Sequence, residues 1–487
     1  MKQKYFPLLI ALLFAIVIAT PVFGQDEIPP DIPEPEEPER APNAPSQPFE
    51  VTKQPLPDKP SSAGREVQPL PRDLVPIQTL GTSDRYSASD HGQEYVAVTH
   101  NRDGDIYVFI YSYGVWINRF LVSDGEGFSY APDIAFEAST GLFIVTWHYL
   151  SETEGWNIQA VAIDPDNWGD EIVGDIVDVA SSSWNESLPS VDCNFYDESC
   201  LVVYSLDNEV DFYRIDGRYM SMNASTGVDE ASSSPNFAIS DLNNEYRPFV
   251  AWSEPDQNYM VAYTWPYAGG GQRWPAYSVV MEYYDYGTPP VLKGTTYGID
   301  SDLGNENEKY SNGIAYDNCS EQYVIMVGHD YNGDGSDYDV YASVIDGGGF
   351  SIWGTIPIAI TYAQENSPDI SYIKDAEFAM FNPTPDRLVI TYYRDGYLDL
   401  DGIIATDLRG NCDPNNPWYS TDPAYLHSVV LNSGGDEYLT RDPSITGSND
   451  GREFFVAFTY LDVGDYDIYG RYMTIVDKNF LPILLKY

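Results

Sequence analysis

The clearest chemical motif in the sequence is an acidic turn that runs from Asp330 to Asp339. Its D-x-N-x-D-G core places oxygen-bearing side chains at alternate positions and a glycine at the bend, as the opening of a calcium-binding loop does. Tyr341 stands where such a loop usually has a glutamate, so Asp337 or Asp339 would replace that ligand. We expect bound Ca²⁺, and the alternative is an Asp/Asn/Gly turn without an ion. The predicted ligands are Asp330, Asn332, Asp334, Ser336, Asp337 and Asp339.

A second set of candidate residues is acidic and precedes the first strand of five sequence repeats. Gathered at one end of the fold, these carboxylates would form a negative rim that captures cations or a cationic partner. A solvated rim on an acidic protein is the alternative. Two of these carboxylates could instead do acid–base chemistry. The five residues are Asp84, Glu186, Glu245, Glu308 and Glu365.

Two histidines and two tryptophans complete the candidate ligand-binding residues. His100 and His148 end the second strand of neighbouring repeats, where they would either bind a transition metal or pack in the core. Trp265 and Trp274 flank a loop with three consecutive glycines. The rings of such a loop could stack on a sugar or grip a peptide, and the alternative is a loop that folds its rings over the edge of the sheet.

The net charge excludes one class of function. The chain has 487 residues, with 25 Lys and Arg against 75 Asp and Glu, so the formal charge is −50 at pH 7. Binding to phosphates requires a basic surface, and we expect no nucleic-acid partner. Hydrophobic residues make up 43% of the chain, which is enough for a large core. No H-E-x-x-H, G-x-S-x-G or phosphate-binding glycine loop occurs in a suitable context.

The N-terminal residues predict export. Residues 1–24 contain two lysines, an uncharged apolar run and small side chains before Gln25, as a cleavable signal peptide does. An uncleaved anchor is the alternative, and no later stretch is long and apolar enough to span a membrane. Residues 25–76 contain 14 prolines and many acids, which predicts a disordered, extended linker. We therefore expect a secreted, extracellular or cell-surface protein, with the periplasm as an alternative.

Export permits disulfide bonds among the four cysteines. Cys193 and Cys200 flank a short turn and would face each other across a hairpin. Cys319 and Cys412 would then form the second pair. Because four cysteines allow three pairings, this choice rests on the hairpin alone, and free thiols are the alternative.

Beyond residue 77 the sequence repeats a short apolar strand seven times. The copies begin at Tyr95, Phe143, Cys200, Tyr259, Tyr323, Arg387 and Phe454. A second apolar segment, often opened by proline as at Pro132, precedes most copies, and a third segment follows them. Such short β-rich segments between Gly, Asp, Asn and Ser are strands. Segments at Val75 and Leu481 resemble a fourth strand, and one of them should complete the last sheet.

Four strands per unit, with units 48 to 67 residues apart, predict the blades of a β-propeller rather than a solenoid. The predicted fold is all-β, a seven-bladed propeller of four-stranded antiparallel blades over residues 77–487, preceded by a signal peptide and a Pro-rich linker. Six or eight blades are the alternative. The expected blades are residues 84–128, 129–184, 185–243, 244–306, 307–363, 364–438 and 439–487.

A family resemblance rests on the strand rhythm and on two matching elements. These are D-I-Y-G-R-Y-M at Asp467 and R-I-D-G-R-Y-M at Arg214. The chain resembles bacterial extracellular β-propeller repeat proteins, with blades similar to those of TolB-like propellers. This resemblance covers residues 77–487 and implies a fold, not an activity. The WD dipeptide is absent, and so is the sialidase Asp-box S-x-D-x-G-x-x-W, so the resemblance does not imply sialidase activity.

Three functions fit these patterns. Our main expectation is a non-catalytic propeller that binds an extracellular glycan or protein on its top face, with calcium stiffening the loops. The alternative is an extracellular carbohydrate-active hydrolase or lyase that uses channel carboxylates, and the third is a passive structural component. A carboxylate pair converging in the channel would favour the enzyme. A shallow aromatic face without such a pair would favour the binding protein.

Overall fold

The computed structural model describes strands and tight turns between Val75 and Thr474, all within one compact unit, Lys53–Tyr487. The described residues are 75–78, 84–92, 94–112, 115–123, 128–151, 155–167, 169, 171–194, 197–207, 213–240, 245–264, 276–282, 297–298, 309–318, 320–330, 338–346, 351–359, 364–373, 387–395, 402–410, 419–421, 440–447, 453–462 and 465–474. The predicted signal peptide and nearly all of the predicted linker lie outside them.

The described strands form seven antiparallel sheets, and none of the described residues is helical. The first sheet has β2 (Asp84–Gly92), β3 (Tyr95–Arg102), β4 (Asp105–Ser112) and β5 (Val115–Leu121). The second has β6 (Ser129–Glu137), β7 (Leu142–Ser151), β8 (Gly155–Ile163) and β9 (Ile172–Ala180). The third has β10 (Asn185–Cys193), β11 (Ser199–Asp207), β12 (Tyr213–Asn223) and β13 (Gly227–Asp229), and β14 (Phe237–Ala238) also pairs with β12.

The other four sheets repeat this order. The fourth has β15 (Tyr246–Ser253), β16 (Asn258–Thr264), β17 (Ala276–Glu282) and β18 (Tyr297–Gly298). The fifth has β19 (Lys309–Asp317), β20 (Gln322–Asp330), β21 (Tyr338–Asp346) and β22 (Ser351–Ala359). The sixth has β23 (Gln364–Ile373), β24 (Arg387–Asp395), β25 (Gly402–Gly410) and β26 (Tyr419–Thr421). The last has β27 (Thr440–Gly447), β28 (Glu453–Asp462), β29 (Asp465–Thr474) and β1 (Val75–Gln78).

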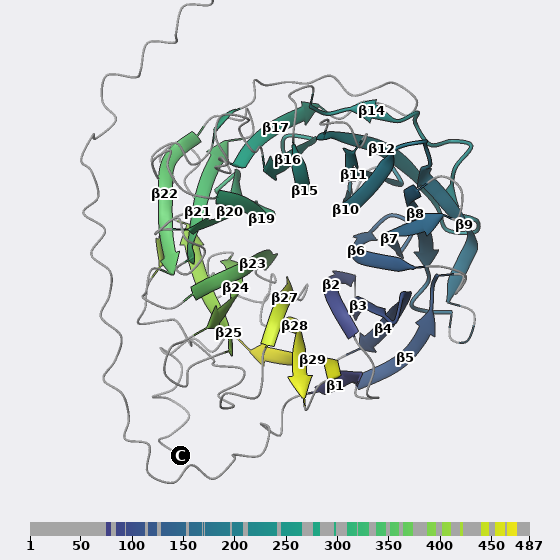
Figure 1. Cartoon of the computed structure of the whole chain (residues 1–487), viewed down its shortest axis with the longest axis horizontal. Coiled ribbons are helices and arrows are strands. Elements are labelled where there is room, and N and C mark those ends of the chain that lie inside the picture. Colours follow the sequence, from purple (N-terminus) through teal and green to yellow (C-terminus); the bar gives the residue numbers. More distant parts are fainter. Residues whose placement is uncertain are drawn as a thin grey trace, which may run out of the picture. The chain divides into compact units, whose positions relative to one another are not determined.

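The sheets stand side by side around a central axis, with the first strand of each nearest that axis (Figure 1). Contacts run from β2 through β6, β10, β15, β19 and β23 to β27, and β27 contacts β2 again. This closed circle of sheets is a β-propeller. The predicted all-β fold of four-stranded antiparallel sheets is confirmed. In keeping with this fold, the described residues include no helix that could cross a membrane.

The N-terminal strand completes the last sheet. Val75 of β1 pairs with Gly470 of β29, so the fourth strand of this sheet comes from the start of the propeller sequence. Of the two segments predicted for this place, the one at Val75 occupies it, and the one at Leu481 lies outside the described residues. Joining the two ends in one sheet covers the edge of β29 and closes the ring.

The second strands are apolar because they are buried on both faces. All nine residues of β20 are buried, and each of the seven predicted apolar strands lies within the second strand of its sheet. Successive side chains pack against opposite neighbours, as the period of a strand requires. Ala97 of β3 joins a cluster with Ile134 of the second sheet, whereas Val98 joins one with Phe455 of the last sheet. The hydrophobic core therefore lies between the sheets.

Every first strand carries an irregularity in its pairing with the second strand. In β6 the register shifts between Tyr130 and Asp133, and in β10 it shifts between Ser187 and Ser190. Pro132 lies inside this bulge rather than opening the strand as the sequence suggested. A bulge interrupts the ladder of hydrogen bonds, so a residue without an N–H is tolerated there.

The predicted hairpin disulfide is confirmed. Cys193 and Cys200 are directly paired across β10 and β11, and their sulfur atoms are bonded. The predicted partners Cys319 and Cys412 lie outside the described residues, so that second pair stays a prediction.

The outer strands of the second and third sheets approach closely. A Cβ atom on Gly227 would lie 1.9 Å from the carbonyl oxygen of Val173, and one on Gly174 would lie 2.1 Å from that of Thr226. Both glycines also have a left-handed φ, of +74° and +77° respectively. Glycine at both positions therefore allows the two sheets to meet at their outer edges.

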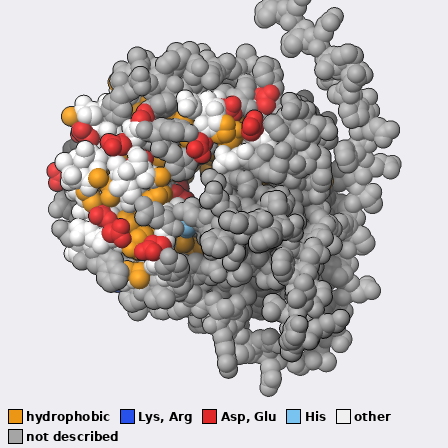
Figure 2. Space-filling view, turned by 180° about the vertical axis from the view of Figure 1, so that it is seen from behind, with side chains coloured by type: hydrophobic (Ala, Val, Ile, Leu, Met, Phe, Trp, Pro, Cys, Tyr) orange, Lys and Arg blue, Asp and Glu red, His pale blue; other side chains and the backbone are white. Residues whose placement is uncertain are grey.

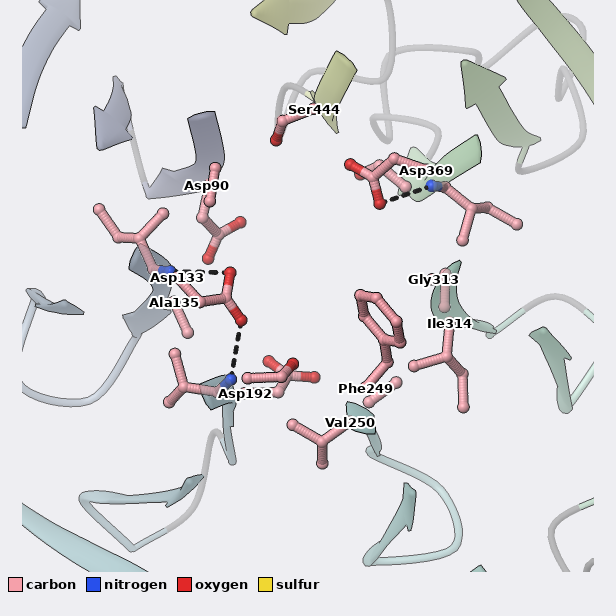
Figure 3. A pocket seen from close by; sticks show the side chains of 18 of the residues that line it. Asp90, Asp133, Ala135, Asp192, Phe249, Val250, Gly313, Ile314, Asp369 and Ser444 are labelled. Atoms are coloured by element: carbon pink, nitrogen blue, oxygen red, sulfur yellow. Dashed lines mark hydrogen bonds between the residues drawn. The ribbon is translucent and has the colours of Figure 1, made fainter. Parts of the chain in front are cut away.

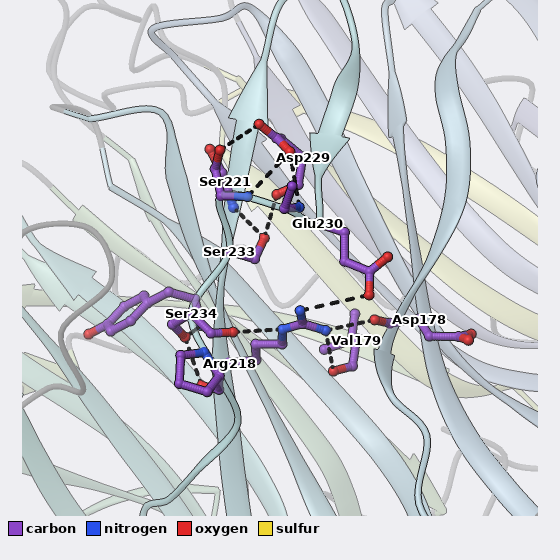
Figure 4. Close-up of polar contacts among 12 residues, drawn as sticks. Asp178, Val179, Arg218, Ser221, Asp229, Glu230, Ser233 and Ser234 are labelled. Carbon is purple, nitrogen blue, oxygen red and sulfur yellow. Dashed lines mark hydrogen bonds and ion pairs between the residues drawn. The ribbon is translucent and has the colours of Figure 1, made fainter.

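Arg218 of β12 joins the same two sheets (Figure 4). Its Nη1 donates to the carbonyls of Asp178 (2.8 Å) and Val179 (3.1 Å) in β9, and its Nε donates to that of Ser234 (2.9 Å). Its guanidinium also lies 3.9 Å from the carboxylate of Glu230. One side chain thus satisfies three carbonyls where neighbouring blades meet.

We expect Arg218→Lys to lower the free energy of unfolding by roughly 2 kcal/mol, because an ammonium cannot reproduce the fork of donors that reaches two sheets. Urea denaturation measures the loss. Arg214→Lys is the matched control, since Arg214 lies on the same strand but pairs with Asp216 of that strand and lies over the ring of Trp184. An equal loss in both variants would show that Arg218 does not hold the sheets together.

Candidate active site

A cavity of about 480 Å³ lies where the first strands surround the axis, and all seven sheets contribute residues to it. Four aspartates stand on its wall. Asp90 of β2, Asp133 of β6 and Asp192 of β10 come together on one side, and Asp369 of β23 lies across the cavity from them (Figure 3). Carboxyl groups from separate blades therefore share one space.

Two of these carboxylates bridge their own sheet to the next in the same way. Oδ1 of Asp133 accepts the N–H of Ile134 at 3.0 Å, and Oδ2 accepts that of Val191 in β10 at 2.9 Å. Asp369 repeats this pattern. It accepts the N–H of the following residue at 2.9 Å and that of Ile445 in β27 at 2.9 Å.

Asp90 and Asp192 lie two residues further beyond the bulges of their strands than Asp133 and Asp369 do, and they make an equivalent bridge to the next sheet. Oδ2 of Asp90 accepts the N–H of Phe136 in β6 at 2.6 Å, and Oδ2 of Asp192 accepts that of Trp252 in β15 at 2.7 Å. A first strand has a neighbour in its own sheet on one side only. The N–H groups on its other edge need acceptors, and these carboxylates supply them.

Burial raises the pKa of all four carboxyl groups, because the charged form loses water that the protein replaces only in part. The pKa is about 7 for Asp90 and Asp369 and about 6 for Asp133 and Asp192. After burial, the negative charges of Asp192 and Asp133 also raise the pKa of Asp90. Near neutral pH, one wall of the cavity therefore holds both a protonated carboxylic acid and carboxylates.

The two rim acids whose side chains are described do not lie on a solvated rim. Glu186 and Glu245 are buried, at 1% and 0% exposure, and each accepts a hydrogen bond from a serine hydroxyl, Ser182 or Ser240. Burial also raises the pKa of Glu186. The side chains of Asp84, Glu308 and Glu365 lie outside the described part. In the view of Figure 2, acidic side chains form separate groups between hydrophobic ones.

The two predicted histidines lie in different environments. His100 is fully buried beside the ring of Phe109, and burial lowers its pKa to about 3. His148 is only partly buried and lines a second cavity. Trp265 and Trp274 lie outside the described residues, so their predicted binding role stays a prediction.

Only the two ends of the predicted calcium-binding turn lie among the described residues. Asp330 ends β20 and Asp339 lies near the start of β21, and both residues are buried. Asn332, Asp334, Ser336 and Asp337 lie outside the described residues. Within the described part of the chain, no cluster of three His, Cys, Asp or Glu residues is arranged to hold a metal ion.

The four cavity aspartates were missed in the sequence, although a signal for them was present. Asp133 and Asp369 follow Pro132 and Pro368 in segments that the sequence identified as first strands. First strands line the axis of a propeller, so an aspartate in an otherwise apolar first strand marks the channel. Which blades face each other depends on the closed ring and not on any local sequence pattern. The sequence therefore pointed to the acids that precede the first strands instead.

The geometry thus defines a β-propeller with an acidic central cavity. No family model matches the chain, and no curated protein sequence matches it. Solved structures that resemble it include the GH93 α-L-arabinofuranosidase of Fusarium graminearum, which is 14% identical over 70% of this chain and 95% of that one, with a TM-score of 0.40.

Two sialidases also resemble the chain. A Hadza microbial sialidase is 11% identical over 64% of this chain, with a TM-score of 0.39. Trypanosoma rangeli sialidase is 10% identical over 84% of this chain, with a TM-score of 0.43. The chain covers only 63% and 60% of the lengths of these two proteins.

These comparisons correct one prediction. The named structural neighbours are glycoside hydrolases, so the expectation of a non-catalytic propeller that binds a glycan or protein is wrong. At identities of 10 to 14% the likeness establishes the fold alone, and the activity has to be argued from the residues of this chain.

We expect Asp90→Asn to flatten the dependence of stability on pH. Between pH 3.8 and about 7 the native state holds more protons at Asp90 than the unfolded chain does. This group therefore makes the free energy of unfolding fall as pH rises, by at most about 1.4 kcal/mol per pH unit. Urea denaturation at several pH values measures the slope, which should be less negative in the variant.

Asp229→Asn is the control for this measurement. A hydrogen bond from Ser232 lowers the pKa of Asp229 below 3.8, so its stabilising effect is lost only in more acidic solution. The control should shift the curve without changing its slope between about pH 5 and 7. Parallel curves for wild type and Asp90→Asn would contradict a raised pKa at Asp90.

Proposed function

We propose that the protein is an extracellular glycoside hydrolase whose reaction takes place in the central cavity. The observation that carries this proposal is the convergence of Asp90, Asp133 and Asp192 on one wall of that cavity. Glycoside hydrolysis needs one carboxylic acid that protonates the leaving oxygen and one carboxylate that acts as base or nucleophile. The signal-like N-terminus and the Cys193–Cys200 disulfide support an exported protein.

Asp90 is assigned the role of acid because burial raises its pKa and the negative charges of both Asp192 and Asp133 add to this rise. Asp90 has a pKa of about 7, whereas Asp133 and Asp192 have a pKa of about 6. At a pH between these values a proton resides mainly on Asp90, which would give it to the glycosidic oxygen. Asp133 or Asp192 would be ionised and would activate water or attack the sugar carbon directly.

Asp369 has a different position and is assigned a structural role. It bridges β23 to β27 as Asp133 bridges β6 to β10, but it faces the other three from across the cavity. It therefore makes the same kind of hydrogen bond without belonging to the proposed catalytic group. This difference allows a clean comparison of variants.

We expect Asp90→Asn to lower kcat by about 10²- to 10⁴-fold, because an amide cannot donate the catalytic proton. The assay measures release of reducing sugar from arabino-, xylo- and cello-oligosaccharides at a pH near 6.5, midway between the two pKa values. In the wild type, activity should fall on both sides of this pH.

Asp369→Asn is the matched control for this loss. Both variants place an amide against a backbone N–H, which costs roughly 1–3 kcal/mol of stability. Asp369→Asn should keep kcat within about tenfold of the wild type, because Asp369 lies across the cavity from the other three aspartates, away from the proposed site of proton transfer. Equal losses of activity in the two variants, in step with equal losses of stability, would refute a catalytic role for Asp90.

We also propose that Ca²⁺ binds the turn that begins at Asp330 and stiffens the hairpin of β20 and β21. Both described ends of this turn, Asp330 and Asp339, are buried carboxylates, and the D-x-N-x-D-G sequence between them supports the proposal.

Added Ca²⁺ should raise the Tm of the wild type by several degrees, and a chelator should reverse the rise. Scanning calorimetry of wild type and Asp334→Ala measures this effect, and the variant should not respond. Mg²⁺ is the control ion, because it prefers a smaller octahedral site. A wild-type Tm that does not change with Ca²⁺ would exclude the site.

A further inference from the structure

A second cavity, of about 390 Å³, lies between the second and third sheets. Its lining residues are Phe128, Tyr130, Ala131, His148, Leu150, Trp156 and Leu188. None of them carries a charged side chain, in a chain with 75 acidic residues. Phe128 is 56% exposed and Leu150 39% exposed, so large apolar side chains face solvent here. Exposed apolar surface concentrated in one hollow marks a binding site.

Four of these residues form a connected group of rings. Phe128 and Tyr130 lie parallel, with 3° between their planes and 6.4 Å between their centres. Trp156 meets Tyr130 edge to face at 5.7 Å and His148 at 4.9 Å. These contacts hold the rings in fixed orientations, so the aromatic surface is formed before a ligand arrives.

His148 adds a hydrogen-bond donor to this surface. Its Nδ1 accepts the N–H of Leu188 at 3.1 Å, and burial lowers its pKa to about 4. The ring is therefore neutral near pH 7 and carries its hydrogen on Nε2. The cavity thus combines aromatic faces with a neutral donor.

The aromatic cavity adjoins the central one. Ala131 and Leu188 line both cavities. Both are non-glycine residues in the left-handed region, with φ of 44° and 53°, and both lie in the bulges of their first strands. Such backbone is costly and persists where the surrounding structure holds it in place. The bulges turn the chain between the two cavities.

We propose that the aromatic cavity is a subsite for one sugar ring of a neutral oligosaccharide whose scissile bond lies in the central cavity. The inference rests on the proposed function for the class of substrate. It adds the charge of that substrate and the residues that bind its distal part.

The chemistry of the two cavities together selects a carbohydrate. A sugar ring presents weakly positive C–H groups on one face, which suit the negative face of an aromatic ring, and its hydroxyls suit carboxylates. A purely apolar ligand would fit the aromatic cavity but not the four aspartates of the central one.

Charge then selects a neutral sugar. The lining of the central cavity includes Asp90, Asp133, Asp192, Asp369 and Glu254 against one basic residue, Arg247. Asp133 and Asp192, whose pKa is about 6, are mainly ionised at neutral pH and would repel an anionic sugar, and repulsion in a partly buried site is only weakly screened by salt.

The test compares the wild type with Phe128→Ala and Trp156→Ala. Substrates are arabino-, xylo- and cello-oligosaccharides of two and of five sugars, and sialyllactose serves as the anionic comparison. Calorimetry measures the Kd, and reducing-sugar release measures kcat and KM. Each variant should weaken binding of the preferred five-sugar substrate by about tenfold and leave the two-sugar substrate within about twofold. Sialyllactose should not bind.

Two features separate this effect from loss of the fold. Phe128 is more than half exposed, so its replacement removes little packing. Trp184→Ala is the matched control, because Trp184 is 41% exposed but lies against Arg214 outside the cavity. This control should bind and cleave both substrate lengths as the wild type does.

The outcomes distinguish the two proposals. If the wild type cleaves the oligosaccharides and both variants match it at each length, the subsite is refuted and the hydrolase stands. If five-sugar ligands bind and the variants lose that binding, but nothing is cleaved, the hydrolase is refuted and the subsite stands. Tight binding of sialyllactose refutes the neutral substrate, and no binding by any oligosaccharide refutes both.

Discussion

The structure depends on how the inner edge of each sheet is satisfied. The first strand of a sheet has a partner on one side, and its other edge presents backbone N–H groups that no strand can pair. Asp90, Asp133, Asp192 and Asp369 accept these N–H groups from the next sheet. Between the last and first sheets, the hydroxyls of Ser444 and Ser89 meet at 2.9 Å. Side-chain acceptors therefore connect blades that share no strand pairing.

This way of connecting blades also creates chemistry. An acceptor that reaches the edge of the next first strand must stand beside the axis, where all four aspartates are partly buried. Burial raises the pKa of each aspartate, and charges on neighbouring aspartates add to the effect at Asp90. The carboxyl groups that join the sheets are thus held near the protonation state that acid–base catalysis requires. In this interpretation stability and catalysis depend on the same side chains.

The bulges in the first strands serve both cavities. Each bulge interrupts the ladder just before the residues that line the axis, and Pro132 and Pro189 are tolerated there because they have no N–H to place. The residues immediately before them, Ala131 and Leu188, adopt left-handed backbone and form the wall shared with the aromatic cavity. The shared wall of the two cavities thus follows from a backbone irregularity that is repeated around the ring.

The sequence by itself determined the local features of this protein. The period of apolar and turn residues predicted the strands and their grouping in fours, and the spacing of Cys193 and Cys200 predicted the hairpin disulfide, because each depends on residues close along the chain. Tertiary structure decided which first strands face one another, that β1 closes the ring, and that Glu186 is buried while Asp90, Asp133 and Asp192 share a cavity. These relations join residues up to several blades apart. Only the closing of the sheets around an axis brings these residues together, and no local sequence pattern predicts which of them will meet.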